Sequence, residues 1–211
     1  MFTDHLEKLE LSSDEDERLA AEIDSAIRKS RGYASYWEWA SDRKLEELGV
    51  GDALVRHLSL SEGLEVRFVR CLEYDPPDIE MITADGRRVG IEVTELVDEK
   101  AAQRARFAKR TGEGASSWAH WDTLKLASEL AVRIAKKEEK LAHCRGHFDE
   151  IILAIPTDEP MITLDMAVTA CATARCNTQN IDRTFLLLGY HPNHTSVEYP
   201  QGIAVLEIRP I

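Results

Sequence analysis

Asp78 and Glu92 stand on the two arms of a segment that reads as a tight β-hairpin, "DPPDIEMITADGRRVGIEVTEL". Two carboxylates that face each other across a hairpin repel, so the pair is destabilising unless positive charge lies between them. A divalent cation fits this role, because carboxylate oxygens suit Mg²⁺ or Mn²⁺ and leave positions for water and a phosphate. The alternative is a solvated polar face whose repulsion is relieved by Arg88 or by other neighbours.

The turn of this hairpin decides whether the two carboxylates meet. A two-residue Asp-Gly turn would put Ile79 opposite Glu92 and mix apolar with polar side chains. A three-residue loop with Gly86 in the left-handed conformation puts Asp78 opposite Glu92 instead, with Cβ atoms roughly 5 Å apart. We predict this second register, because it sorts apolar from polar residues and a one-residue slip would undo the sorting. Its apolar face contains Ile79, Met81, Val89, Ile91 and Val93.

Lys137 is a third candidate, because it interrupts an apolar stripe in the helix predicted over residues 117–143. Leu130, Ile134 and Leu141 recur at helical spacing, and Lys137 falls among them. An unpaired buried ammonium is costly, so a lysine in this position needs a partner such as a carboxylate on the sheet. The alternative is that Lys137 extends from the edge of the stripe into water.

The hydrophobic pattern predicts one mixed α/β domain around these residues. The basic, glycine-containing stretch 97–116 predicts a mobile loop, and the aromatic cluster after Gly32 predicts packing on the core, with base stacking as the alternative. The order of elements predicts an α/β (α+β) sandwich with a mixed central sheet, in which residues 1–62 pack as a helical segment on a core of 63–211. Helices are predicted over 14–29, 42–60 (in two pieces, broken near Gly49 and Gly51), 117–143 and 164–175, and strands over 64–73 (with Leu64, Val66 and Phe68 on one face), 78–83, 89–96, 149–157, 183–190 and 202–209.

Composition and charge exclude some functions. The chain has 211 residues and a net charge of −12, so any nucleic-acid role must rest on a local basic patch, a metal or a partner subunit. No apolar run approaches the roughly 20 residues that span a bilayer, and the acidic N-terminus lacks a signal segment, so we expect a cytoplasmic protein without a membrane partner. Four dispersed cysteines predict reduced thiols, and His143, Cys144 and His147 suggest zinc only weakly because no fourth ligand is evident nearby.

The sequence "PPD" at 76–78, followed by a hairpin and "IEVTEL" at 91–96, resembles the PD-(D/E)XK nuclease superfamily. The order helix, three strands, helix, strand also resembles that family's core, which implies a restriction-endonuclease-like fold. In this resemblance Asp78 corresponds to the motif's Asp and Glu92 to the acidic residue of (D/E)XK. Thr94 stands where the motif's lysine is expected. Some members carry that lysine on the following helix, which makes Lys137 the first candidate and Lys140 the second.

The resemblance implies metal-assisted hydrolysis of phosphodiester bonds. Asp78, Glu92 and the backbone carbonyl of Val93 would hold Mg²⁺ or Mn²⁺, and Lys137 would orient the attacking water and stabilise charge on the phosphate. The expected substrate is nucleic acid, DNA ahead of RNA, contacted by the basic residues of 97–116, with a solvated loop that has no such role as the alternative. The alternative is an inactive nuclease-fold protein that acts as a binding or assembly module. The resemblance also suggests that a glutamate from the first core helix joins the site; the candidates are Glu38, Glu46 and Glu47. It further suggests a dimer or partner contact through the ends of strands 183–190 and 202–209.

Overall fold

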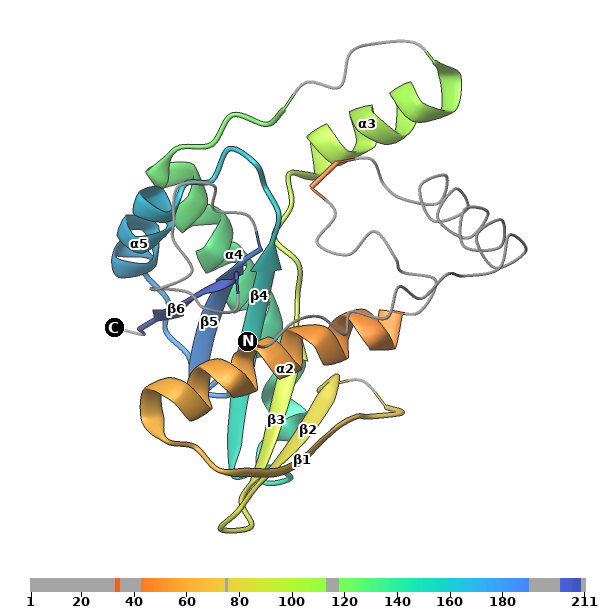
Figure 1. Cartoon of the computed structure of the whole chain (residues 1–211). Coiled ribbons are helices and arrows are strands. Elements are labelled where there is room, and N and C mark those ends of the chain that lie inside the picture. The colour runs from red at the N-terminus through yellow and green to blue at the C-terminus, as the bar shows by residue number, and fades with distance from the viewer. Residues whose placement is uncertain (1–32, 35–42, 75, 113–117, 190–201, 210–211) are drawn as a thin grey trace, which may run out of the picture.

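The computed structural model describes residues 33–34, 43–74, 76–112, 118–189 and 202–209 (Figure 1). The helix predicted over 14–29 and most of the aromatic cluster lie outside these ranges. Tyr33 lies within them and is 6% exposed in the main apolar core, as predicted for that cluster. Within the described part of the chain, no helix combines the length and the apolar character needed to cross a membrane.

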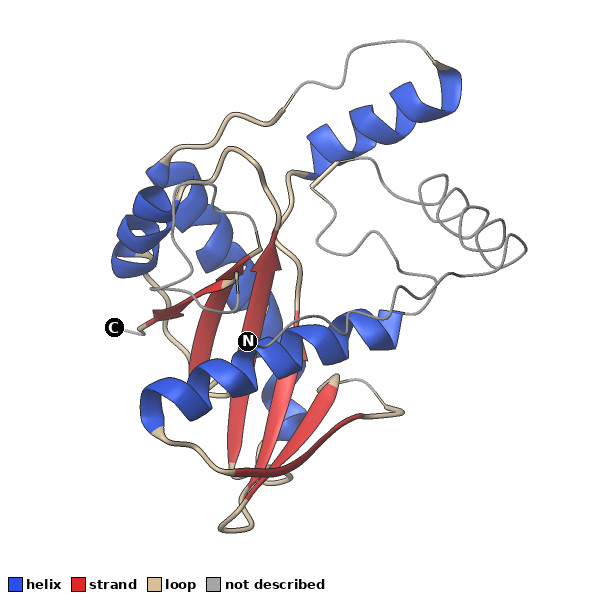
Figure 2. Ribbon diagram, viewed as in Figure 1, coloured by secondary structure: helices blue, strands red, loops and turns tan. Residues whose placement is uncertain are grey.

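A six-stranded mixed sheet forms the centre of the fold, as the sequence predicts (Figure 2). The strands follow one another across the sheet in chain order. β3 pairs in parallel with β4 and β4 with β5, while the other neighbours are antiparallel. The strands are β1 Val66–Cys71, β2 Ile79–Thr83, β3 Arg88–Val93, β4 Glu150–Thr157, β5 Arg183–Leu188 and β6 Ala204–Ile208.

Helices cover both faces of the sheet and bury a separate apolar cluster on each (Figure 1). α2 (Arg43–Glu62) packs over the face that carries Ile79 and Ile91. α4 (Thr123–Leu141) and α5 (Leu164–Thr173) cover the opposite face. α4 lies within the crossover between the parallel strands β3 and β4, and Lys137 on it reaches Glu92 on β3.

A helix is confirmed over most of 42–60, but the predicted break near Gly49 and Gly51 is wrong, because α2 runs without a break. Gly51 is buried where α2 crosses the sheet, and a Cβ there would lie 2.7 Å from Ile79 Cδ1. The glycine therefore permits a close approach between helix and sheet instead of ending the helix.

The alternation predicted for the first strand is also wrong in part. A β-bulge lies between Val66 and Phe68, and it changes the face of every residue that follows. Phe68 is consequently 47% exposed, whereas Val69 lies opposite Met81 and packs against the cluster beneath α2. A bulge shifts the period-two pattern without leaving a trace in the apolar spacing.

The stretch 97–116, predicted as a mobile loop, contains helix α3 (Glu99–Thr111). Asp98 caps its N-terminus by accepting a hydrogen bond from Ala101 N at 2.8 Å, and Gly112 ends it with φ of 69°. The buried side of the helix consists only of alanines, which give a weak apolar signal among many charged residues. These are Ala101, Ala102 and Ala105.

Candidate active site

The hairpin adopts the register that brings the two carboxylates together. Ile79 pairs with Ile91 and Met81 with Val89, and Gly86 has φ of 89°. One step beyond the first pair, Asp78 lies opposite Glu92, so the predicted register is confirmed. Both acids are buried, with 6% of Asp78 and 0% of Glu92 exposed.

Glu92 is held on one oxygen and unpartnered on the other. Its Oε1 accepts hydrogen bonds from Lys137 Nζ and, at 3.3 Å, from Lys140 Nζ. Among the described residues, Glu92 Oε2 is the buried side-chain oxygen that has no hydrogen-bond partner. Asp78 is oriented differently, because its Oδ2 accepts a hydrogen bond of 2.8 Å from the backbone N–H of Val93. The backbone amide and the two lysines therefore relieve the repulsion between the acids.

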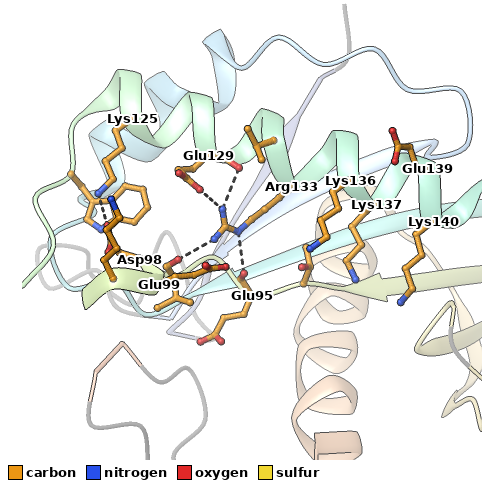
Figure 3. A pocket seen from close by; sticks show the side chains of 15 residues that line it. Glu95, Asp98, Glu99, Lys125, Glu129, Arg133, Lys136, Lys137, Glu139 and Lys140 are labelled. Atoms are coloured by element: carbon orange, nitrogen blue, oxygen red, sulfur yellow. Dashed lines mark hydrogen bonds and ion pairs between the residues drawn. The ribbon is translucent and has the colours of Figure 1, made fainter. Parts of the chain in front are cut away.

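Lys137 reaches Glu92 because it belongs to the inward face of α4. Leu130, Ile134 and Leu141 are buried as predicted, and the side chain of Lys137 is only 15% exposed. It bends towards β3 instead of extending into water. Lys140, one turn closer to the C-terminus, points the same way but is 38% exposed (Figure 3).

Glu80, on the same face of the hairpin, shows what a fully satisfied glutamate looks like in this protein. It is 1% exposed, and its two oxygens accept hydrogen bonds of 2.8 Å from Arg88 Nε and Arg70 Nε. Burial raises the pKa of Glu80, but the hydrogen bonds and charges of the two arginines outweigh it and hold the pKa below its usual value. Arg88 is thus paired with Glu80. This pairing counts against the alternative that Arg88 relieves the repulsion between Asp78 and Glu92.

Gly90 allows the loop before β2 to fold onto β3. A Cβ at this position would lie 2.9 Å from Pro77 Cγ and 3.2 Å from Phe148 Cγ. The loop is also held by Cys144, whose Sγ donates to the carbonyl of Pro76 at 3.4 Å. These contacts fix the backbone immediately before Asp78. Cys144 therefore anchors the loop, and no group of three or more His, Cys, Asp or Glu side chains that could hold a metal is found among the described residues.

An open cleft of about 1220 Å³ runs between α4 and the segment that follows β3 (Figure 3). Thr94, the residue at the expected lysine position, lines the cleft together with Lys136, Lys137 and Lys140. Arg133 fixes the opposite wall, since its guanidinium donates to the carbonyls of Glu95 at 3.2 Å and Val97 at 3.0 Å.

Another buried acid, Glu159, was not predicted, and it bonds Asp98 and Trp121, two residues that line the cleft. It is 1% exposed and accepts hydrogen bonds from Tyr33 Oη at 2.7 Å, Trp121 Nε1 at 2.8 Å and the backbone N–H of Asp98 at 2.6 Å. Burial and, to a smaller extent, Glu159 itself raise the pKa of the Tyr33 phenol well above its usual value. The only sequence signal was an acid two residues after a buried strand, and its partners come from three distant segments.

The candidate glutamates of the first core helix are placed only in part. Glu47 is buried at 9% and accepts a hydrogen bond of 2.6 Å from Arg43 Nε, whereas Glu46 is partly exposed. Glu38 lies outside the described residues. α2 packs on the face of the sheet opposite to α4, so Glu47 and Lys137 approach the hairpin from different sides.

The site thus combines two buried carboxylates, a lysine pair and an open cleft. Comparison with known proteins adds no family to this description: no family model matches the chain, and neither a curated protein nor a solved structure matches it.

Proposed function

We propose that this protein is a metal-dependent nuclease of the PD-(D/E)XK kind with a restriction-endonuclease-like core. In this proposal Asp78, Glu92 and the backbone carbonyl of Val93 hold Mg²⁺ or Mn²⁺, and Lys137 replaces the lysine missing at Thr94. The observation that carries the proposal is the fully buried carboxylate of Glu92, which has lysines on Oε1 and no partner on Oε2.

The chemistry of the unpartnered oxygen fits a hard cation. A buried acceptor without a partner costs about 1–3 kcal/mol, and more when the group is charged. Glu80 shows that this hairpin satisfies both oxygens of a buried glutamate when only structure is required. Two carboxylates and a carbonyl form an incomplete oxygen set, which suits a cation such as Mg²⁺ that keeps waters and binds substrate phosphate.

Bound Mg²⁺ or Mn²⁺ would supply Lewis-acid polarisation of a phosphodiester and would lower the pKa of a coordinated water. The protein itself contributes a preorganised ammonium. Lys137 Nζ is held in place by Glu92 Oε1 and its stem by the packed stripe of α4. A fixed cation at this position can orient a water by hydrogen bonding and stabilise negative charge that develops on the phosphate. Lys140 is the secondary cation, because its hydrogen bond to Glu92 is longer and its side chain is more exposed.

A noncatalytic binding or assembly module remains the alternative, and one observation favours it. Lys137 and Lys140 already offset the charge of Glu92, so the cluster can exist as a buried ion pair without a metal. The two functions differ in whether the protein binds divalent cations.

The test combines metal calorimetry with cleavage assays on plasmid, single-stranded DNA and RNA, in Mg²⁺, Mn²⁺ or EDTA. Glu92→Gln and Asp78→Asn should each reduce metal-dependent cleavage by at least about 100-fold, the scale of losing a preorganised electrostatic group. Glu80→Gln is the matched control, because Glu80 is equally buried on the same face but satisfied by arginines. Cleavage that survives in the Glu92 and Asp78 variants would overturn the site assignment, and absence of both cleavage and metal binding would overturn the nuclease function and favour the alternative.

A further inference from the structure

Helix α3 concentrates positive charge in an acidic protein. Its residues Glu99–Thr111 include five basic side chains and one acidic side chain, whereas the whole chain has a net charge of −12. The alanine side of the helix is buried, so the charged side faces outward. The exposed residues of that outward side include Lys100, Gln103, Arg104, Arg106, Phe107 and Arg110.

An exposed aromatic ring lies in the middle of this basic face. Phe107 is 51% exposed, and the guanidinium of Arg110 lies 5.8 Å from the centre of its ring. Lys100, Arg104 and Phe107 recur at the spacing of one helical face. Cations that flank an accessible aromatic ring are the combination with which proteins bind single strands, the cations on phosphates and the ring on a base.

The basic face adjoins the candidate active site. α3 extends beyond the ends of β3 and β4, and Lys100 in its first turn lines the cleft that also contains Lys136 and Lys137 (Figures 1 and 3). The base of the helix is held firmly, because Glu159 accepts the hydrogen bond of the Asp98 backbone N–H. Lys125 Nζ donates to the Asp98 carboxylate at 2.7 Å as well. The helix therefore has a fixed start beside the cleft.

We propose that α3 is the docking helix for a single-stranded segment of the nucleic-acid substrate. Lys100, Arg104 and Arg110 contact phosphates, Phe107 stacks on an unpaired base, and the strand continues along the cleft towards Lys137. The strand is single because a stacking ring needs a base face that a duplex keeps covered. The inference rests on the proposed nuclease function, since it takes the docked strand as the substrate of the Glu92 site. Because the chain carries a net charge of −12, its remaining surface repels a polyanion, which favours binding at the basic face of α3.

Binding is measured by fluorescence anisotropy in EDTA, with a labelled oligodeoxythymidylate of about 12 nucleotides and a duplex of equal length. We expect the single strand to bind more tightly than the duplex. Arg104→Glu combined with Arg110→Glu should weaken binding by at least about 100-fold and lower the salt slope by about 0.7 for each phosphate that the variant no longer neutralises. Phe107→Leu, which keeps an apolar side chain but removes the ring, should weaken single-strand binding by about 10-fold. Arg67→Glu, on the exposed edge strand β1, is the control for a single charge reversal away from α3 and should leave binding unchanged.

Cleavage assays distinguish failure of this inference from failure of the nuclease function. The α3 variants should hydrolyse the small diester bis(p-nitrophenyl) phosphate at the wild-type rate, because it does not need the docking helix. Oligonucleotide binding and cleavage that are unchanged in these variants would overturn the α3 inference and leave the nuclease function intact. Binding that depends on α3, without hydrolysis of any substrate, would support docking and overturn the nuclease function. Equal affinity for the duplex or for polyglutamate would show a general polyanion surface and overturn the single-strand assignment.

Discussion

Lys137 on α4 forms an ion pair with Glu92 on β3, and the glutamate is fully buried beneath it. α3 separates β3 from α4 in the chain, but α4 packs on the sheet face that carries Glu92, so the contact is part of that packing. The same contact occupies only one oxygen of the carboxylate. A pair that serves packing alone would be expected to satisfy both oxygens, as Glu80 does.

The two lysines should separate catalysis from metal binding. Lys137→Ala is expected to abolish turnover while leaving the calorimetric affinity for Mn²⁺ nearly intact, because the lysine contacts Glu92 Oε1 and not Oε2. It should also lower the free energy of unfolding by about 2 kcal/mol, since a buried charge loses its closest partner. Lys140→Ala is the matched control and should cost much less, because its side chain is 38% exposed. Turnover that is abolished in Lys140→Ala but kept in Lys137→Ala would show that Lys140 has the catalytic role instead.

Glu80 should contribute to the acid limb of the stability curve. Its pKa is lowered in the folded state, so its stabilising contribution is present above the unfolded value of about 4.5 and is lost as the pH falls through the lower folded value. Urea unfolding at a series of pH values measures this. Glu80→Gln should be less stable than the wild type near pH 7, and the difference should shrink below about pH 4. A difference that stays constant with pH would contradict the ion-pair explanation.

Gly90 should be intolerant of a side chain, because a Cβ would meet Pro77 and Phe148. Gly90→Ala is expected to cost about 1–3 kcal/mol of unfolding free energy and to weaken metal binding, since it displaces the loop that leads into Asp78. Gly51→Ala is the comparison on the other face of the hairpin, where the new methyl meets the flexible end of Ile79. It should leave metal binding unchanged. If the two variants changed metal binding equally, the position of the loop before Asp78 would not control metal binding.

Glu159 should be required as a charged acceptor. Glu159→Gln places an amide donor among three donors and is expected to lower the free energy of unfolding by about 1–3 kcal/mol. Trp121 reports the change directly, because its indole N–H bonds Glu159 and its fluorescence should shift. Glu139→Gln, an exposed position on α4, is the control and should fall within about 0.5 kcal/mol of the wild type. If Glu159→Gln changed neither the free energy of unfolding nor the Trp121 fluorescence, the hydrogen bonds of Glu159 would not hold the base of α3.

Local patterns predicted the parts of the site that depend on a short stretch of chain. The register of Asp78 opposite Glu92 follows from alternation and from the turn at Gly86, and the inward position of Lys137 follows from the spacing of the α4 stripe. The predictions that were wrong needed information from distant residues. The bulge before Phe68 and the close approach at Gly51 have no signature in periodicity.

In the hairpin and in α4, the sequence by itself determined which side chains share a face, because side-chain direction follows from the period of a strand or a helix. Only the tertiary structure decided which charges meet across elements. It paired Lys137 with Glu92, gave Arg88 to Glu80, and gathered three distant donors around Glu159. These choices depend on how helices and sheet pack, since the net energy of a buried charge is set by partners far away in the chain.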